Sequence, residues 1–241
     1  MTQQMTSDGQ LLCIIPAKGN SQRFPRKNLA RFQGRPLVAQ AIVVAQASRM
    51  FSTVCVSSED DEILSVAKEY GADVALRRTE DLVSADVQVV DVCRSVVEYF
   101  VDQGQEFFAF AVLLPTSPLR IANDLQRAYQ IMMETNARSC MSLVECEHPP
   151  QRAVCLQEGH VAPFFEGDNF KQTQKLEKLY RHDGTVIFSR IDTFLQDPYF
   201  YGENVVPYFV ERERGVDVDN PLDLAWAEFL CDSGSLNVQL K

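Results

Sequence analysis

The 241-residue chain carries 23 Lys and Arg residues against 33 Asp and Glu residues, which gives a formal net charge of −10. This balance argues against a broad affinity for nucleic acid or for anionic membrane surfaces, because both require positive charge. The sequence contains no run of about 18 apolar residues that could span a bilayer, and residues 1–10 lack the pattern of a signal peptide, so we expect a cytoplasmic protein.

Short apolar runs alternate with segments of helical periodicity over the first 145 residues. The run at 11–15 ends abruptly at Pro16, as a buried strand does, and a polar loop follows it. The same alternation then repeats. Strands are expected at 11–15, 53–57, 107–114 and 140–144, and helices over 36–48, 63–70, 89–100 and 125–132. This order predicts an α/β fold with a mainly parallel central sheet and flanking helices.

The pattern weakens from about 145 to 180 into polar, aromatic and turn-forming residues, which predicts an insertion or lid. Regular structure is expected to resume at 185–189, 205–210 and 216–219. A helix then follows, with an expected buried face of Leu222, Ala225, Trp226 and Phe229.

The seven cysteines are scattered among apolar segments without a CxxC pair, and the three histidines lack the spacing of zinc ligands. We therefore expect reduced, mostly buried thiols and no structural zinc.

The loop after the first predicted strand, residues 16–28 (here the first loop), concentrates positive charge in an otherwise acidic protein. Ligands of open α/β sheets bind beyond the carboxyl ends of the strands, so this loop could receive a triphosphate. Gly19 allows close approach, Ser21 and backbone amides can donate to phosphate oxygens, and three cations offset negative charge: Lys18, Arg23 and Lys27. The loop is neither a Walker A nor a GxGxxG sequence, and a solvated basic loop is the alternative interpretation.

A second polar segment, PTSPLR at 115–120, follows the buried run at 107–114. Its two prolines would stiffen the backbone and hold the hydroxyls of Thr116 and Ser117 in place. A purely structural turn is the alternative.

A third segment, 216–221, places Asp217 and Asp219 on one face if the chain is extended. Two parallel carboxylates repel each other unless a cation joins them, and Mg²⁺ commonly uses such carboxylates together with substrate phosphates. The alternative is that these residues only begin a helix, with Asn220 as its cap and Pro221 in its first turn.

These three segments, in this order and spacing, resemble the acylneuraminate cytidylyltransferase family, the CMP-sialic acid synthetases and their relatives. The family signature PAR-x-GS-x-R-x-x-x-KN is similar to residues 16–28, PTSPLR stands at 115–120, and the Asp-x-Asp motif is similar to 217–219. Weaker similarities lie at 147–150 (EHPP) and 180–184 (YRHDG).

The resemblance implies a Rossmann-like nucleotidyltransferase fold in a single domain, 1–241. It also implies a small dimerisation insertion at about 145–180 that helps to complete the partner's sugar site, and therefore a homodimer. The implied reaction transfers CMP from CTP to the anomeric hydroxyl of a sialic-acid-like, nine-carbon 2-keto sugar acid and releases pyrophosphate.

With this function, we expect Lys27 to stabilise the transition state of in-line attack on the α-phosphorus, while Asp217 and Asp219 hold Mg²⁺. The expected nucleotide-binding residues are Ala17, Lys18, Gly19, Ser21, Arg23, Lys27, Asn28, Arg78, Thr116 and Ser117. The expected sugar-binding residues are Arg152, Tyr180, Arg181, Asp183, Phe164 and Phe165.

The chain departs from the family pattern in ways that leave the sugar open. Lys18 replaces an Arg, Leu114 stands where the sialic acid enzymes commonly have Gln, and Asp183 replaces the Asn of YR-x-NG. Legionaminic, pseudaminic, deaminoneuraminic and octulosonic acids are therefore alternative substrates. A non-catalytic nucleotide-sugar binding protein is the alternative from a different class.

Overall fold

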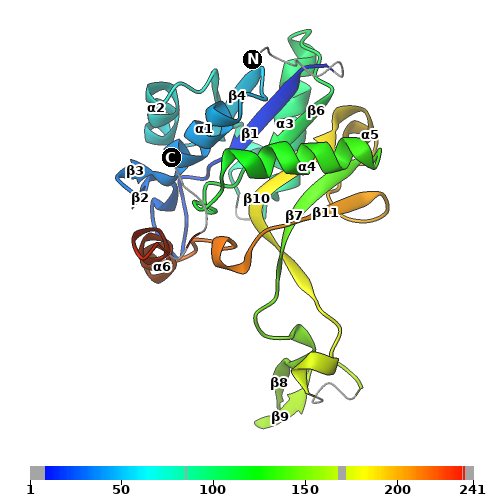
Figure 1. The fold of residues 1–241 in the computed structure, drawn as a ribbon. Coiled ribbons are helices and arrows are strands. Elements are labelled where there is room, and N and C mark those ends of the chain that lie inside the picture. Colours follow the sequence, from blue (N-terminus) through cyan, green and yellow to red (C-terminus); the bar gives the residue numbers. More distant parts are fainter. Residues whose placement is uncertain (1–8, 85, 168–171, 235, 237–241) are drawn as a thin grey trace.

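The computed structural model describes residues 9–84, 86–167, 172–234 and 236. Within them, a seven-stranded central sheet has the order β11-β7-β10-β6-β1-β4-β5 (Figure 1). Its strands are β1 (Leu11–Pro16), β4 (Thr53–Ser58), β5 (Val74–Arg77), β6 (Ala109–Val112), β7 (Ser139–Glu145), β10 (Tyr180–Arg190) and β11 (Val205–Phe209). The predicted strands at 11–15, 53–57, 107–114, 140–144, 185–189 and 205–210 are confirmed in position, whereas β5 was not anticipated.

Every pairing in this sheet is parallel except those of β10, which runs antiparallel to both β6 and β7. After β7 the chain leaves the sheet, passes through the insertion and returns directly as β10, so these two strands form a long hairpin, and hairpin strands are antiparallel. The predicted, mainly parallel sheet is confirmed.

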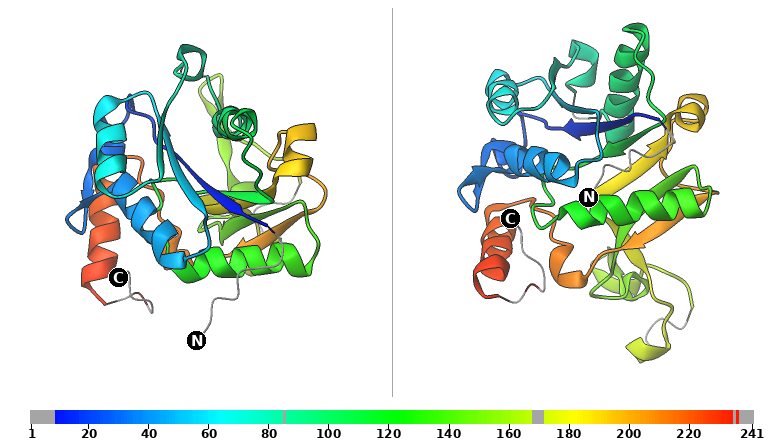
Figure 2. Two further views of the ribbon diagram at one scale, coloured as in Figure 1. Left: turned by 90° about the horizontal axis from the view of Figure 1, so that it is seen from above. Right: turned by 45° about the horizontal axis from the view of Figure 1, so that its top comes forward.

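Helices cover both faces of the sheet (Figure 2). One face packs against α1 (Leu37–Ser48), α2 (Asp61–Glu69) and α4 (Ala122–Glu134), and the other against α3 (Val89–Asp102) and α5 (Ile191–Gln196). Successive residues of β1 alternate between these two cores, as the geometry of a strand requires. The short 3₁₀ turns are η1 (Lys27–Leu29), η2 (Glu80–Leu82), η3 (Pro150–Arg152), η4 (Thr173–Lys175) and η5 (Arg212–Arg214).

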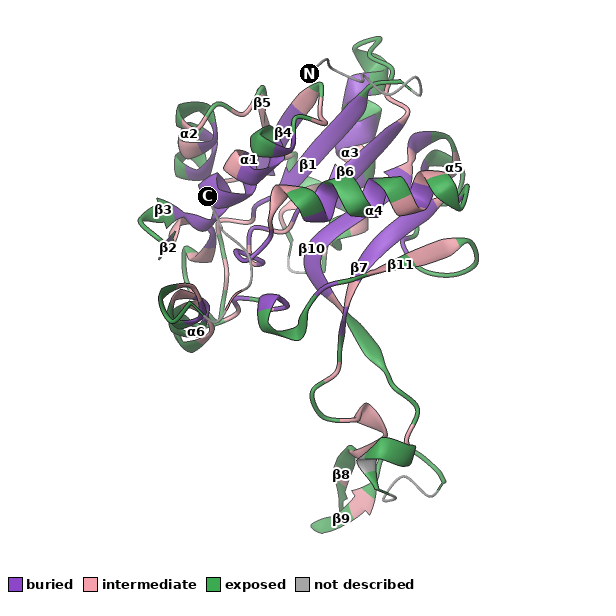
Figure 3. Ribbon diagram, viewed as in Figure 1, coloured by how far each residue is buried: buried purple, intermediate pink, exposed green. Residues whose placement is uncertain are grey.

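The predicted insertion projects from the body between β7 and β10 and carries a small hairpin of β8 (Val154–Gln157) and β9 (His160–Pro163) (Figure 1). Figure 3 shows that this part of the chain is mostly exposed, in contrast to the buried sheet. Leu156 and Val161 are 78% and 70% exposed. A two-stranded hairpin is marginally stable in water by itself, so the insertion presents apolar side chains that its own chain does not cover.

The last helix, α6 (Pro221–Asp232), buries a different face from the predicted one. Ala227 and Leu230 are buried, whereas Leu222, Trp226 and Phe229 are 76%, 51% and 56% exposed. The buried face packs against Leu119 and β2 (Arg31–Phe32). β2 pairs with β3 (Arg35–Pro36) in a second small hairpin. Because α6 is apolar around much of its circumference, the buried face is set by its cap and by these neighbours.

The segment Val216–Asp219, predicted to be regular structure, forms no strand. Val218 is fully buried and donates its N–H to the Thr116 carbonyl at 2.8 Å, which holds the segment beside the turn after β6. Among the helices that the structure describes, none is long and apolar enough to cross a membrane.

Candidate active site

The first loop borders a pocket of about 590 Å³ at the carboxyl end of β1. The side chains of Lys18, Ser21, Arg23 and Lys27 line it together with Asp219. The first loop and the Asp-x-Asp segment, which lie far apart in the sequence, therefore share one cavity. This is the edge of a parallel sheet at which ligands bind.

Lys27 and Asp219 form the central contact of this site, although they lie 192 positions apart in the sequence. The Lys27 ammonium donates to Asp219 Oδ1 at 2.8 Å, and Arg23 pairs with Asp219 Oδ2 at 2.7 Å. The hydrogen bond from Lys27 is the main reason why the pKa of Asp219 lies below its usual range. The Lys27 side chain is only 14% exposed, so its charge is held in a fixed position at the pocket wall.

Asp217 lies beside this contact and has a different environment. Partial loss of solvation raises the pKa of its carboxyl, and the charge of Asp219 raises it further, whereas a hydrogen bond from Thr116 opposes both effects. Asp217 nevertheless keeps much of its surface in contact with solvent. The two acids thus lie within electrostatic reach of each other, as their alternation in the sequence predicted.

The carboxylate pair fits Mg²⁺ in the type and number of its ligands. No group of three or more His, Cys, Asp or Glu side chains that could hold a metal occurs among the residues described here. Asp217 and Asp219 would therefore need substrate phosphates and water to complete the coordination, which is how Mg²⁺ is commonly bound. Asp219 would share its charge between the metal and its two cationic neighbours.

The remaining nucleotide-side residues hold the first loop in shape. Lys18 donates from Nζ to the Ser84 carbonyl at 2.9 Å, and the buried Asn28 donates from Nδ2 to the Lys18 carbonyl at 2.7 Å. The N–H groups of Gly19 and Asn20, expected to be available to phosphate, donate instead to Glu59.

Two further residues predicted to bind the nucleotide, Ala17 and Arg78, contact Ser57 near the end of β4. Ala17 is fully buried and donates its N–H to the Ser57 carbonyl at 2.9 Å. The Arg78 guanidinium binds the same residue, at 3.0 Å from its carbonyl and 3.2 Å from its hydroxyl. Arg78 therefore lies at the carboxyl edge of the sheet, but its side chain is occupied there.

The structure corrects the predictions that Ser117 binds the nucleotide and that Asp183 binds the sugar. Both residues are 1% exposed, and their side chains form hydrogen bonds within the protein. Ser117 Oγ donates to the Asp183 carbonyl at 2.6 Å, and the Asp183 carboxylate accepts from Ser142 and Thr185, each at 2.6 Å. These hydrogen bonds join β10 to β7 and to the PTSPLR turn. Neither side chain is available to a ligand in this arrangement.

Arg120 explains why the PTSPLR turn is rigid. Its buried guanidinium donates to the carbonyls of Leu114 (2.8 Å), Gly184 (2.7 Å) and Thr185. Burial lowers the pKa of Arg120 to about 10, with the nearby Asp183 opposing the shift, so the guanidinium stays charged at neutral pH. Arg120, the last residue of the turn, thus joins Leu114 at its start to β10.

The residues predicted to bind the sugar fall into two groups. Tyr180 and Arg181 begin β10, and Arg181 donates to the Gly215 carbonyl at 2.7 Å, two residues before Asp217. Arg152 lies in η3, and Phe164 and Phe165 follow β9, all within the projecting insertion (Figure 1). Within one chain the structure brings Arg181 beside the acids, whereas the Tyr180 side chain lines a separate pocket with Phe209, and the second group stays in the insertion.

Sequence reasoning missed an apolar pocket of about 210 Å³ beside the end of β6. Leu114 and His182 line it, and the side chains of Tyr199, Phe200 and Tyr201 close it. Leu114 is only two residues from Thr116, which spans at most about 7 Å, so this pocket lies next to the acids. Burial lowers the pKa of His182, so its imidazole is neutral at neutral pH. The run of three aromatic residues at 199–201 was the available sequence signal.

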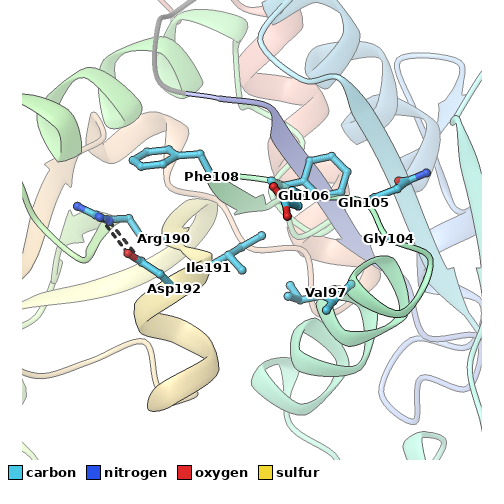
Figure 4. A pocket seen from close by; sticks show the side chains of 10 residues that line it. Val97, Gly104, Gln105, Glu106, Phe108, Arg190, Ile191 and Asp192 are labelled. Carbon is cyan, nitrogen blue, oxygen red and sulfur yellow. Dashed lines mark hydrogen bonds and ion pairs between the residues drawn. The ribbon is translucent and has the colours of Figure 1, made fainter.

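A further pocket, of about 510 Å³, lies at the opposite edge of the sheet (Figure 4). It is lined by residues that precede β6, including Phe108, and by the end of β10, where Arg190 pairs with Asp192 at 3.0 Å and lies 5.2 Å from the Phe108 ring centroid. This pocket lies before the start of β6, whereas the turn at 115–120 follows the end of β6. The pocket is therefore separate from the candidate site.

Comparison with known proteins is consistent with this geometry. A family model described as Cytidylyltransferase matches residues 12–216. The chain is 31% identical over 220 residues to the pseudaminic acid cytidylyltransferase of Campylobacter jejuni subsp. jejuni serotype O:23/36, covering 91% of this chain and 95% of that protein. It is 28% identical over 226 residues to the CMP-N,N'-diacetyllegionaminic acid synthase of Legionella pneumophila, covering 92% and 97%.

A solved structure of CMP:2-keto-3-deoxy-manno-octonic acid synthetase complexed with CTP superimposes with a TM-score of 0.69 and 16% identity. The match covers 94% of this chain and 100% of that one. At this level of identity the likeness shows the fold alone, and it confirms the Rossmann-like class predicted from the sequence.

Proposed function

Because the chain belongs to the cytidylyltransferase family, we propose that it transfers CMP from CTP to the anomeric hydroxyl of a sialic-acid-like, nine-carbon 2-keto sugar acid and releases pyrophosphate. The observation that carries this proposal is the convergence of Lys18, Arg23, Lys27 and Asp219 on one pocket. Such a concentration of cations favours the binding of a triphosphate, whereas the net charge of the whole protein, −10, opposes it.

Lys27 is proposed to stabilise the transition state. In-line attack on the α-phosphorus places negative charge on the non-bridging and leaving oxygens, and a preorganised cation lowers the energy of that charge distribution. The short contact with Asp219 and the low exposure of Lys27 hold its ammonium in place before substrate arrives. Lys18 and Arg23 would bind the remaining phosphates.

Magnesium is proposed as the metal cofactor, held by Asp217 and Asp219. When bound, it would neutralise phosphate charge and orient the triphosphate. The two acids differ in their environment: Asp219 is kept ionised by Lys27, whereas Asp217 is partly desolvated and would gain from a cation nearby.

The apolar pocket lined by Leu114 and His182 is proposed to hold the acylamino or deoxy substituents of the sugar, which need apolar surroundings. Arg181, near the acids, could bind the sugar carboxylate with its planar guanidinium. Pseudaminic and legionaminic acids carry such substituents, and enzymes named for both are among the relatives. Pseudaminic acid is the first substrate to test, because the relative named for it is 31% identical.

A homodimer is proposed in which the insertion of one chain completes the sugar site of the other. The insertion projects from the body, exposes apolar side chains and contains Arg152, Phe164 and Phe165. A second copy of the chain would bring these residues to the site and cover the exposed hairpin. We also propose a cytoplasmic location, because CTP is available there.

The test is pyrophosphate release from CTP and Mg²⁺ with a panel of pseudaminic, legionaminic, sialic, deaminoneuraminic and octulosonic acids. ATP, GTP and UTP replace CTP in matched controls, and a chelator removes the metal. We expect release only with CTP, Mg²⁺ and one class of sugar acid. Release that is independent of the sugar acid, or no release with any member of the panel, would contradict the proposed reaction.

A further inference from the structure

The first loop is held from behind by a glutamate that the proposed mechanism does not use. Glu59 Oε1 accepts a hydrogen bond from the Gly19 N–H at 2.7 Å and a longer one from the Asn20 N–H at 3.3 Å. Glu59 directly follows β4, so it joins the loops after two adjacent parallel strands. The three cations of the candidate site all belong to the first of these loops.

Glu59 lies outside the pocket that these cations border. Its side chain is 15% exposed, and the pocket is lined by Asn20 and its neighbours but not by Glu59. Among the residues that the structure describes, its second oxygen, Oε2, is buried without a hydrogen-bond partner, and Arg78 pairs with it at 3.8 Å. Glu59 therefore contacts the first loop from outside the pocket, and its carboxylate does not occupy the place of a bound phosphate.

The loop also lies in close contact with the start of α2. A Cβ atom added to Gly19 would lie 2.6 Å from Asp60 Cβ and 2.8 Å from Asp60 Oδ2. Asp60 cannot move freely, because it caps α2 by accepting from the N–H groups of Glu62 and Ile63. Gly19 thus rests on a rigid helix terminus, and Glu59 holds it there.

The charge of Glu59 makes its position informative. A carboxylate near a triphosphate site opposes the binding of the anion, so a buried glutamate here weakens CTP binding unless it does something else for the loop. In the loop, Glu59 accepts hydrogen bonds from two backbone amides, those of Gly19 and Asn20. Fixing a loop before substrate arrives removes an ordering cost from binding.

We propose, on the basis of the CTP-binding role proposed above, that Glu59 is a positioning residue for CTP. By accepting from Gly19 and Asn20 it fixes the backbone of the first loop, from which Lys18 and Ser21 line the pocket. It contacts neither the nucleotide nor the sugar. Its loss should therefore weaken CTP binding far more than it changes turnover at saturating CTP or the KM for the sugar acid.

The experiment measures the equilibrium binding of CTP with Mg²⁺ by calorimetry in the absence of sugar, for the full chain and four variants. Glu59→Ala removes the acceptor and the charge, Glu59→Gln removes only the charge, and Glu59→Asp keeps the charge but shortens the side chain. Glu69→Gln, an exposed glutamate at the far end of α2, is the control. Thermal unfolding of each variant tests the fold.

We expect Kd for CTP to rise about tenfold in Glu59→Ala, because two hydrogen bonds to the loop are lost. Glu59→Asp should show a similar rise, and its retained charge makes it the decisive variant if Glu59→Ala does not fold. Glu59→Gln should stay within about threefold of the wild type, because an amide oxygen still accepts both N–H groups. Glu69→Gln should bind as the wild type does.

Unchanged CTP binding in Glu59→Ala and Glu59→Asp would overturn the positioning role. Tighter binding in both Glu59→Ala and Glu59→Gln would also overturn it, since Glu59 would then act only as an opposing charge. If the wild type binds no CTP, the proposed function itself fails, and this inference fails with it. Loss of CTP binding in Glu59→Ala with rescue in Glu59→Gln is the supporting result.

Discussion

The nucleotide side and the sugar side of the candidate site are built in different ways. On the nucleotide side, Lys27, Arg23 and Asp219 are already in contact within one chain. On the sugar side, an apolar pocket and Arg181 lie near the acids, but Arg152 and the phenylalanines belong to the projecting insertion. The difference is in line with the proposal that a single chain binds the triphosphate and that a second copy completes the sugar site.

The largest expected effect tests the preassembled nucleotide side. Lys27→Ala should lower kcat/KM by about a thousandfold, the upper range for the loss of one preorganised group that stabilises transition-state charge. Steady-state pyrophosphate release measures it. Arg26→Ala is the matched control, because Arg26 belongs to the same loop but pairs with Glu62 on α2. Equal losses in both variants would mean that general loop charge matters and the position of Lys27 does not.

A mixing experiment tests whether the sugar side needs a second copy. Lys27→Ala and Arg152→Ala should each be inactive alone, but co-expression in equal amounts should restore about a quarter of the wild-type activity, because half of the dimers are mixed and each mixed dimer has one intact site. Co-expression of Lys27→Ala with Asp219→Ala, which both lie on the nucleotide side of one chain, is the control and should restore nothing. No recovery in the first mixture would place Arg152 outside the partner's site.

Asp183 gives a smaller effect that separates stability from sugar recognition. Asp183→Ala should lower the free energy of unfolding by about 2–4 kcal/mol, because it leaves the buried Ser142 and Thr185 hydroxyls without their acceptor. Denaturant unfolding measures this, and the ratio of activities across the sugar panel should not change. A changed sugar preference with unchanged stability would return Asp183 to the sugar site.

The smallest expected effect concerns the face of α6. Trp226→Gln should change the free energy of unfolding by about 0.5 kcal/mol, because Trp226 is half-exposed. Leu230→Ala, on the buried face, should cost about 2–4 kcal/mol. Comparing the two by denaturant unfolding tests the observed orientation of the helix. The reverse order would restore the face predicted from the sequence.

Much of the architecture was predictable because its signals are local. The abrupt end of the run at 11–15, the periodicity of 89–100 and the apolar run at 140–144 each report the environment of their own residues, and β1, α3 and β7 confirm them. The alternation of Asp217 and Asp219 was also local, so their common face was expected even though the segment is not a strand. The motifs at 16–28 and 217–219 were assigned to one site from the family resemblance, and the Lys27–Asp219 contact supports that assignment.

Other features depended on contacts that a local pattern does not encode. The direction of β10 follows from the return of the chain through the insertion, and the buried face of α6 follows from Phe32, Leu119 and the Asn220 cap. Asp183 looked like a site residue because a carboxylate in a motif suggests a ligand, yet Ser142, which bonds to it, lies on another strand.

The sequence by itself therefore determined the order of the elements, the character of the first loop and the presence of paired acids, because periodicity and charge are properties of neighbouring residues. Only the tertiary structure decided which polar side chains reach the pocket and which are consumed in the core. It also showed Glu59 behind the loop, because the partners of a buried polar group are set by how distant segments pack.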